Sequence, residues 1–371
     1  MKVVIVGGGN LGALLAANCS LVSGVEVTLL TRKPELFSRV LKVIDEEQNT
    51  TFQSEPISIT KDYKEALLDA DVVLCTLPSF LREQFAIDAE PYLSSNSLVG
   101  FVPGSGGVEF SCRNLIRKGI VIFGLQRVPY ICRMLEAGKE CLSKSKKKSV
   151  FVGAIPKEKT TEICKMLESL LGITMISLPN YLSVTLTPSN PILHTSRLYS
   201  LFREHVDGKV YEKNPLFYQE WTDDASGVLV GCDLELQELC GEIEELDLSK
   251  VVSLLVHYES DSISGLTRKI RSIQAFNGIE TPMLKVKEGY IPDWNSRYFT
   301  EDYPYGLAII KGFALLADCR TPNIDASLFW YQKMSGLEYF LPDGKLGKDI
   351  LQSGVPQKYS YQSLDEIIKL Y

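Results

Sequence analysis

The histidines of this chain are few, and one of them lies in a segment that suggests chemistry. Of the three, His205 lies in a polar stretch where we expect a surface residue, and His257 lies in an apolar stretch where we expect a core or interface residue. His194 instead follows prolines at positions 188 and 191, which mark the start of a helix. An imidazole gains and loses a proton near neutral pH, so it suits general acid–base catalysis. Although an isolated histidine is more often structural than catalytic, we expect His194 to be the acid–base group of an active site.

A second unusual segment covers residues 296–306, which read SRYFTEDYPYG. It places an arginine, a glutamate, an aspartate and three tyrosines immediately before an apolar stretch that we expect to be helical. Solvated loops rarely combine so many aromatic and charged groups, and this favours a functional segment. The alternative is a capping segment in which Asp302 lies near the N-terminus of the following helix.

A glycine-rich turn lies near the N-terminus, where Gly7, Gly9 and Gly12 form the pattern G-x-G-x-x-G. The turn directly follows an apolar run and opens a helical stretch, which is the context in which this pattern binds a dinucleotide. Gly7 permits the tight turn, Gly9 lets the backbone approach a pyrophosphate, and Gly12 allows close packing of helix and strand. Free N–H groups at the start of the helix, around Asn10 and Leu11, would hold the phosphates. The alternative is a glycine-rich turn that binds no ligand.

The residues after the second apolar run indicate which dinucleotide binds. Such folds usually place an acidic residue there to bind the ribose 2′-hydroxyl of NAD, whereas an arginine suits the 2′-phosphate of NADP. This chain has Thr31, Arg32 and Lys33, and no carboxylate before Glu35. We therefore expect NADP, with Arg32 and Thr31 contacting the phosphate. Alternatively, Arg32 stacks on the adenine and the cofactor is NAD.

The two halves of the chain differ in the elements that would position these residues. In the first half, short apolar runs alternate with helical patterns, which indicates parallel strands joined by right-handed crossovers and covered on both faces. In the second half, apolar residues recur at spacings of three and four, as in amphipathic helices. We therefore predict an α/β fold, with an N-terminal Rossmann-type doubly wound sheet in residues 1–183 followed by an all-α C-terminal domain in residues 184–371. The expected strands are 3–6, 25–30, 71–76, 97–102, 120–123 and 150–152, and the expected helices are 10–22, 193–205, 234–246, 248–260, 306–319 and 364–371.

The overall composition excludes several classes of protein. The 371 residues are 45% hydrophobic and 23% charged, which is typical of a folded globular chain. A net charge of −7 argues against a nucleic-acid-binding surface or a polybasic membrane anchor. Nine scattered cysteines without a Cys-x-x-Cys spacing argue against disulfides and a structural zinc site, and we expect no metal. The N-terminal apolar run is too short for a signal peptide and residues 305–319 are too few to span a bilayer, so we expect a cytoplasmic protein.

Four segments together resemble the octopine/nopaline (opine) dehydrogenase family, within the 6-phosphogluconate dehydrogenase-like superfamily of two-domain proteins. They are residues 7–12 (GGGNLG), 126–133 (QRVPYICR), 190–194 (NPILH) and 297–306 (RYFTEDYPYG). The last two are far more specific than any glycine motif. The resemblance implies a Rossmann domain, a helical domain and an active site in the cleft between them. It also implies reductive condensation of an α-keto acid, such as pyruvate, with the amino group of an amino acid, using NADH or NADPH.

The resemblance also implies roles for individual residues. The catalytic histidine of the family falls on His194, its aspartate partner on Asp302 and its substrate-binding arginine on Arg297. Asp302, hydrogen-bonded to the far ring nitrogen of His194, would fix the tautomer and favour the imidazolium. The guanidinium of Arg297 would bind a substrate carboxylate through two parallel hydrogen bonds. Asn190 would bind substrate or the nicotinamide carboxamide, or would instead cap the helix, and Arg133 is a candidate for a second carboxylate.

Two other functions fit the same two-domain plan. A ketopantoate reductase-like enzyme would reduce a keto acid with NADP and no amine, but relatives of that kind use a lysine at the domain junction, where this chain offers His194. A non-enzymatic NADP(H)-binding sensor would need none of His194, Asp302 and Arg297. The opine-type interpretation is therefore favoured, although Thr195 stands where that family often has a proline. Apolar helical faces near the C-terminus are either buried within the chain or used to form a homodimer.

Overall fold

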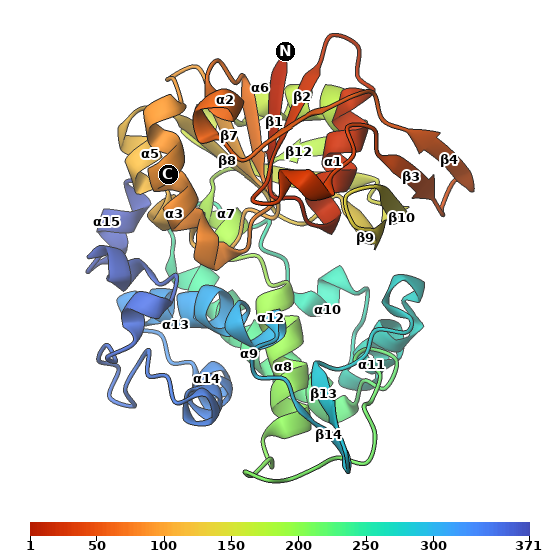
Figure 1. Cartoon of the computed structure of the whole chain (residues 1–371). Helices are drawn as coiled ribbons and strands as arrows, with labels where there is room; N and C mark the ends of the chain where they lie inside the picture. Colours follow the sequence, from red (N-terminus) through yellow and green to blue (C-terminus); the bar gives the residue numbers. More distant parts are fainter. The chain divides into compact units, whose positions relative to one another are not determined.

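The computed structural model describes all residues, 1–371, and the chain divides into two compact units (Figure 1). The first unit comprises Met1–Thr185 together with Leu370–Tyr371, and the second comprises Leu186–Lys369. The last two residues therefore return to the unit in which the chain begins.

An eight-stranded sheet forms the centre of the first unit. In spatial order its strands are β12 (Thr174–Ser177), β11 (Ser149–Ile155), β8 (Val121–Leu125), β7 (Leu98–Phe101), β6 (Val72–Cys75), β1 (Lys2–Val6), β2 (Glu26–Leu30) and β5 (Ser58–Thr60). Neighbouring strands are parallel except β8 and β11, which are antiparallel. Strand β1 lies inside the sheet, between β6 and β2. Because β1 and β2 are parallel, their carboxyl ends lie side by side, where dinucleotide-binding folds place their ligand.

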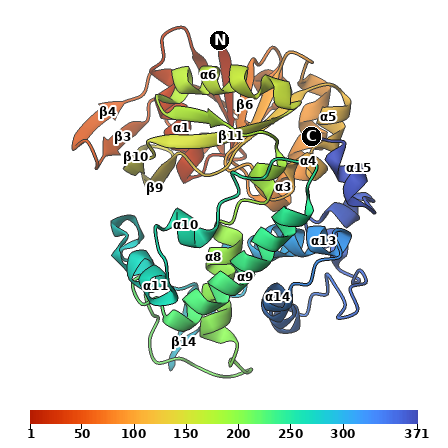
Figure 2. The ribbon, with the colours of Figure 1, turned by 180° about the vertical axis from the view of Figure 1, so that it is seen from behind.

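Both faces of this sheet are covered, because alternate residues of β1 enter different cores. Val3 and Ile5 pack with α1 (Asn10–Ser20) and α6 (Thr160–Leu171), and Figure 2 shows α6 lying over β11. Val4 and Val6 pack instead with helices that cover the opposite face. These helices are α2 (Tyr63–Leu67), α3 (Ser79–Ala89), α4 (Val108–Ser111), α5 (Arg113–Arg117) and α7 (Leu182–Thr185). A strand buried on both faces must be apolar throughout, and the predicted doubly wound sheet is confirmed.

The first unit also contains a four-stranded sheet that the sequence analysis does not predict. Its spatial order is β4 (Thr50–Gln53), β3 (Lys42–Asp45), β10 (Glu140–Lys146) and β9 (Tyr130–Glu136). Many residues of these strands are polar and partly exposed, so no continuous apolar run marks them. The segment QRVPYICR thus leads into strand β9, whose Met134 N–H donates to the side-chain oxygen of Asn10 over 2.9 Å.

Helices organise the second unit. Here α8 (Asn190–Phe202) packs along α9 (Asp223–Glu242), the longest helix of the chain (Figures 1 and 2). The further helices are α10 (Leu254–His257), α11 (Ile263–Ser272), α12 (Arg297–Thr300), the π-helical turn η5 (Tyr303–Leu307), α13 (Ala308–Leu316), α14 (Pro322–Ser335) and α15 (Leu364–Ile368). The 3-10 turns of the two units are η1 (Pro34–Leu36), η2 (Glu90–Tyr92), η3 (Lys157–Lys159), η4 (Gln274–Phe276), η6 (Ile350–Gln352) and η7 (Pro356–Tyr359). None of the helices combines the length and the apolar composition needed to cross a bilayer.

The predicted helical domain is confirmed, but the structure differs from the prediction in two details. Residues 248–260 are expected to form one helix, but only Leu254–His257 are helical, because the Ser253 side chain accepts the Val256 N–H and starts a new helix. The expectation of an all-α domain misses a two-stranded hairpin, formed by β13 (Met283–Val286) and β14 (Gly289–Pro292). Its strands have four residues each and are mostly half-exposed, so burial imposes no clear alternation on their sequence.

A buried carboxyl group joins two helices of the second unit. Asp233 of α9 accepts the Leu254 N–H at the start of α10 over 2.6 Å. Burial raises the pKa of Asp233 to about 6, although the hydrogen bond from the Leu254 N–H opposes the shift. The Asp233 carboxylate therefore caps the start of α10, although burial keeps it away from water.

This shift makes the contribution of Asp233 to stability dependent on pH. Because its pKa is raised in the folded state, its contribution is fully present below the unfolded pKa of about 4 and is lost as the pH rises through about 6. Relative to the Asp233→Asn variant, the wild type should therefore lose about 1 kcal/mol of unfolding free energy between pH 5 and pH 7.5. Urea unfolding of both proteins at the two pH values measures this difference, and a pH-independent difference would contradict the assignment.

Candidate active site

The glycine-rich turn joins β1 to α1 in a backbone conformation that side chains would block. Gly7 has φ of +104°, and its N–H donates to the Leu30 carbonyl over 2.9 Å at the end of β2. A Cβ atom on Gly12 would lie 1.8 Å from the Gly7 carbonyl oxygen, so the helix can approach the turn only with glycine there. A Cβ atom on Gly9 would meet nothing within 4 Å, and no side chain caps the start of α1. The open face at Gly9 and the uncapped helix start fit a pyrophosphate group.

The other predicted cofactor residues lie around this turn. Asn10 is exposed, but its side-chain oxygen already accepts a hydrogen bond from β9. The Leu11 side chain packs partly against the core. Each residue would therefore bind a ligand through its backbone N–H group. Thr31 lies close to Gly8. A Cβ atom added to Gly8 would be 2.8 Å from the hydroxyl oxygen of Thr31. Arg32 follows it with an exposed side chain, and the first acidic residue is Glu35 in η1. A cation without a neighbouring carboxylate fits a 2′-phosphate better than a 2′-hydroxyl.

In the second unit, His194 is bonded at both ring nitrogens. Its side chain on α8 is almost buried, and its Nδ1 lies 2.7 Å from Oδ2 of Asp302. Its Nε2 lies 2.7 Å from the hydroxyl oxygen of Tyr218. The ring of Tyr298 covers the imidazole with a centroid separation of 4.4 Å. The structure thus brings together His194 and Asp302, which are 108 residues apart in sequence.

The close approach of two helical segments creates this pair. Asp302 immediately precedes the π-helical turn η5, and such turns often occur at functional sites. In η5, a Cβ atom on Gly306 would lie 2.6 Å from the side chain of Pro191 at the start of α8. The Tyr303 hydroxyl of the same turn is 3.3 Å from the Thr195 carbonyl of α8. Glycine at 306 therefore permits the contact that sets Asp302 against His194.

The electrostatics of the pair follow from its burial. Removal from water raises the pKa of the Asp302 carboxyl, and the neighbouring His194 acts in the opposite direction. A carboxylate only accepts hydrogen bonds, so it places a proton on Nδ1 of His194. The neutral imidazole then carries its lone pair on Nε2, which is the nitrogen that faces Tyr218. This arrangement allows His194 to accept or release a proton at Nε2.

Sequence reasoning missed Tyr218, which lies in the irregular segment between α8 and α9. The buried Arg197 of α8 holds this segment, donating to the carbonyls of Phe217 over 3.1 Å and Glu220 over 2.7 Å. The Tyr218 ring stacks on Phe276 at 4.1 Å, and burial raises the pKa of its hydroxyl well above the usual value. The run of aromatic residues at 217, 218 and 221 was the only signal in the sequence that could have indicated this role.

The predicted substrate-binding residues have different surroundings. The Arg297 side chain is 65% exposed, and its Nε and Nη2 both bond Glu301, at 2.7 Å for Nε. No role was predicted for Glu301 from the sequence. Asn190 is an exposed first residue of α8; Ser189 is the capping position, and no side-chain hydrogen bond caps this helix. Arg133 is exposed on β9 in the first unit.

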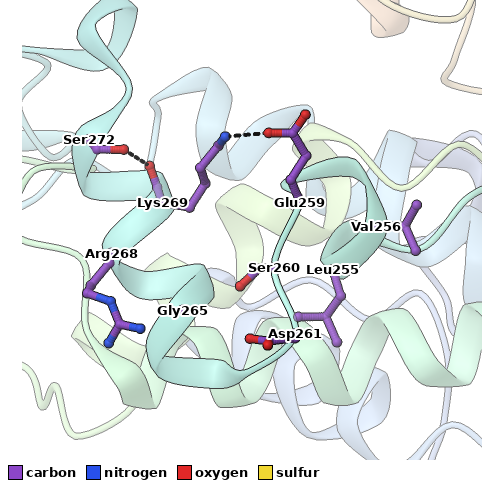
Figure 3. Close-up of a pocket in the computed structure, with 9 residues that line it drawn as sticks. All are labelled: Leu255, Val256, Glu259, Ser260, Asp261, Gly265, Arg268, Lys269 and Ser272. Atoms are coloured by element: carbon purple, nitrogen blue, oxygen red, sulfur yellow. Dashed lines mark hydrogen bonds and ion pairs between the residues drawn. The ribbon is translucent and has the colours of Figure 1, made fainter.

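A separate surface pocket of 680 Å³ lies between α10 and α11 in the second unit (Figure 3). An ion pair of 2.8 Å between Lys269 and Glu259 joins the two sides of this region. None of the candidate site residues lines the pocket. His257 ends α10 with an exposed side chain, so it is neither a core residue nor part of the His194 cluster. No group of three or more His, Cys, Asp or Glu side chains is arranged to hold a metal ion.

The contact at Gly306 provides a test of how the His194–Asp302 pair is positioned. A Gly306→Ala substitution should push η5 away from Pro191, lengthen the hydrogen bond to Asp302 and lower turnover by about 10- to 100-fold, as expected for a displacement near 1 Å. Gly227 of α9 has open space around it, so Gly227→Ala is the matched control and should retain full turnover. Steady-state kinetics together with circular dichroism would make the comparison. Full activity in a folded Gly306→Ala protein would show that the contact does not set the pair.

Known proteins match both units of the chain. Residues 177–335 match the family model described as NAD/NADP octopine/nopaline dehydrogenase, alpha-helical domain, and residues 3–127 match the ketopantoate reductase (PanE/ApbA) model. The octopine dehydrogenase of Pecten maximus is 29% identical over 99% of this chain and 98% of its own. The tauropine dehydrogenase of Arabella iricolor is 28% identical over 98% of this chain and 99% of its own. A solved octopine dehydrogenase structure with NADH and L-arginine superposes with a TM-score of 0.88 at 29% identity, covering 99% of this chain and 98% of that one.

Proposed function

The chain belongs to the octopine/nopaline dehydrogenase family, and from this premise we propose that it uses NADH or NADPH to condense an α-keto acid with the amino group of an amino acid. The observation that carries the proposal is the buried His194–Asp302 pair at 2.7 Å. A chain that only bound a dinucleotide would have no use for an oriented acid–base group. We assign cofactor binding to residues 1–183 and the acid–base chemistry to residues 184–371.

The nicotinamide cofactor would be held by the glycine-rich turn of the first unit. When bound, it supplies the hydride that reduces the carbon–nitrogen double bond. The backbone at Gly7, Gly9 and Gly12 would hold the pyrophosphate, with the N–H groups of Asn10 and Leu11. The octopine dehydrogenase structure that resembles this chain contains NADH. The exposed Arg32 without a nearby carboxylate instead supports our assignment of NADPH as the preferred cofactor here.

His194 would move the protons that condensation requires. Its neutral Nε2 would take a proton from the substrate ammonium, which frees the amine to attack the keto carbon. The resulting imidazolium, stabilised by Asp302, would return that proton to the hydroxyl group of the carbinolamine. Water then leaves and the carbon–nitrogen double bond forms. General acid–base groups of this kind typically contribute about 10²- to 10⁴-fold to the rate.

Arg297 would bind the carboxylate of the keto acid. Its Nε and Nη2 bond Glu301, so an incoming carboxylate would either use Nη1 or displace Glu301. This competition with Glu301 would lower the affinity of Arg297 for a substrate carboxylate. We further assign Asn190 to the substrate or the nicotinamide carboxamide, because Ser189 already occupies the capping position of α8. Arg133 remains our candidate for a second carboxylate.

We also place the enzyme in the cytoplasm and in amino-acid metabolism. All nine cysteines are free thiols, and six of them are buried. Burial raises the pKa of several of these thiols, which keeps them protonated and unreactive. Such a set of unpaired cysteines supports a reducing compartment.

Turnover should depend on an amine and on His194. Purified protein should oxidise NADPH or NADH with pyruvate or another keto acid only when an amino acid is present. A screen of keto acids against amino acids, with cofactor oxidation followed by absorbance, would identify the substrate pair. His194→Ala should lower turnover by about 10²-fold or more without loss of cofactor binding. His257→Ala, at an exposed site, is the matched control. Oxidation that needs no amine would instead support a ketopantoate reductase-like enzyme, the alternative suggested by the match of residues 3–127.

Cofactor preference should depend on Arg32. Arg32→Ala should weaken NADPH binding by about tenfold or more and leave NADH binding nearly unchanged, because only NADPH carries the 2′-phosphate. Arg39, another exposed arginine of the first unit, provides the control variant Arg39→Ala. Fluorescence titration with both cofactors measures the dissociation constants. An equal effect on the two cofactors would defeat the assignment of Arg32 to the 2′-phosphate.

A further inference from the structure

We propose that the hydroxyl of Tyr218 carries the proton between His194 and the reacting atom of the substrate. The proposal rests on the opine-type function above and specifies how the acid–base group reaches its substrate. It starts from the fact that both nitrogens of the imidazole are bonded to protein groups, Nδ1 to Asp302 and Nε2 to Tyr218, each at 2.7 Å. His194 therefore has no free nitrogen to offer. Either the proton passes through Tyr218, or Tyr218 must move away.

The packing of Tyr218 favours passage through the hydroxyl over displacement of the ring. The side chain is 4% exposed and stacks on Phe276 at 4.1 Å and 19°. Phe217 packs on its edge at 4.9 Å, and Trp221 lies parallel to it at 6.3 Å. The Arg197 bonds to the Phe217 and Glu220 carbonyls fix the backbone on both sides. Moving the ring would break these contacts, whereas a relay needs only a rotation of the O–H bond.

The hydroxyl has the bonding pattern that a relay requires. A phenol can accept one proton while it donates its own. Besides its bond to His194, the Tyr218 hydroxyl has a hydrogen bond with the hydroxyl of Tyr298, whose side chain is only partly buried. A reacting oxygen or nitrogen would replace the Tyr298 hydroxyl at this position. Burial raises the pKa of Tyr218 well above the usual value, so the group stays a neutral hydroxyl at neutral pH.

The proton movements balance at each step. To free the amine, a substrate N–H bond breaks and its proton goes to Oη of Tyr218, while the Tyr218 proton goes to Nε2 of His194. Attack of the free amine on the keto carbon forms the C–N bond and moves the C=O π electrons onto oxygen, and that oxygen takes a second proton from the same nitrogen to give the neutral carbinolamine. To expel water, the Nε2 proton returns to Oη and the Tyr218 proton goes to the carbinolamine hydroxyl. The electron pair of the breaking C–O bond leaves with that oxygen, and the nitrogen lone pair forms the C=N bond. His194 and Tyr218 end as they began, and each transfer moves two protons.

Tyr218→Phe tests the relay, because it keeps the stacked ring and removes only the hydroxyl. In the amine-dependent reaction, kcat should fall by about 10²-fold or more, with KM values changed by less than about threefold. Tyr331→Phe is the matched control, since Tyr331 is a buried tyrosine of α14 outside this cluster. Wild-type single-turnover rates in H₂O–D₂O mixtures provide a second measurement that needs no variant. If two protons move together in the transition state, the rate should depend on the deuterium content of the solvent along a curve, not a straight line.

The outcomes separate the relay from the proposed function. Retained kcat in Tyr218→Phe, or a linear isotope dependence in the wild type, overturns the relay while leaving the opine-type function intact. An increase in kcat does the same and identifies Tyr218 as a group that must move aside. If the wild type turns over no keto acid and amine pair in the screen, the proposed function fails and the relay fails with it. If Tyr218→Phe does not fold, the isotope dependence alone decides.

Discussion

A carboxylate held away from water must be paired, and the pairing of Asp302 with His194 is the constraint on which the second unit depends. Only 14% of the Asp302 side chain and 9% of the His194 side chain are exposed, so water solvates neither group well. The pair exists because a π-helical turn and the start of α8 touch at Gly306 and Pro191. Small changes in that contact would separate the two side chains and leave the Asp302 carboxylate buried without its partner, which typically costs about 3–5 kcal/mol.

The two units build their binding features from different parts of the chain. In the first, backbone atoms form the glycine-rich turn to which we assign the cofactor, and side chains are excluded from it by contacts such as Gly12 against Gly7. In the second, the site consists of side chains whose rings and hydrogen bonds hold one another. Backbone donors suit phosphates that many proteins share, whereas packed side chains can be specific to one reaction.

The sequence predicts the features that local patterns encode and misses those that depend on tertiary contacts. Continuous apolar runs such as residues 3–6 indicate buried strands, and the glycine spacing indicates the turn that follows. The pairing of His194 with Asp302 has no local signature, and it was anticipated only through a family resemblance. Tyr218 lies in a segment without regular structure, and the four-stranded sheet consists of partly exposed polar strands. The pairing of Glu301 with Arg297 is an exception, because it is a local i,i+4 contact within one helical turn.

Trp221 gives this arrangement an optical consequence. Its indole lies parallel to the Tyr218 ring, within 6°, and its N–H donates to Ser226 over 2.9 Å. The other two tryptophans, Trp294 and Trp330, lie 6.1 Å from each other and stack with neither Tyr218 nor His194. A chain in which those two are replaced by phenylalanine would carry a single tryptophan, one ring away from the imidazole. The fluorescence of Trp221 would then respond to changes in charge near its indole ring, without any added label.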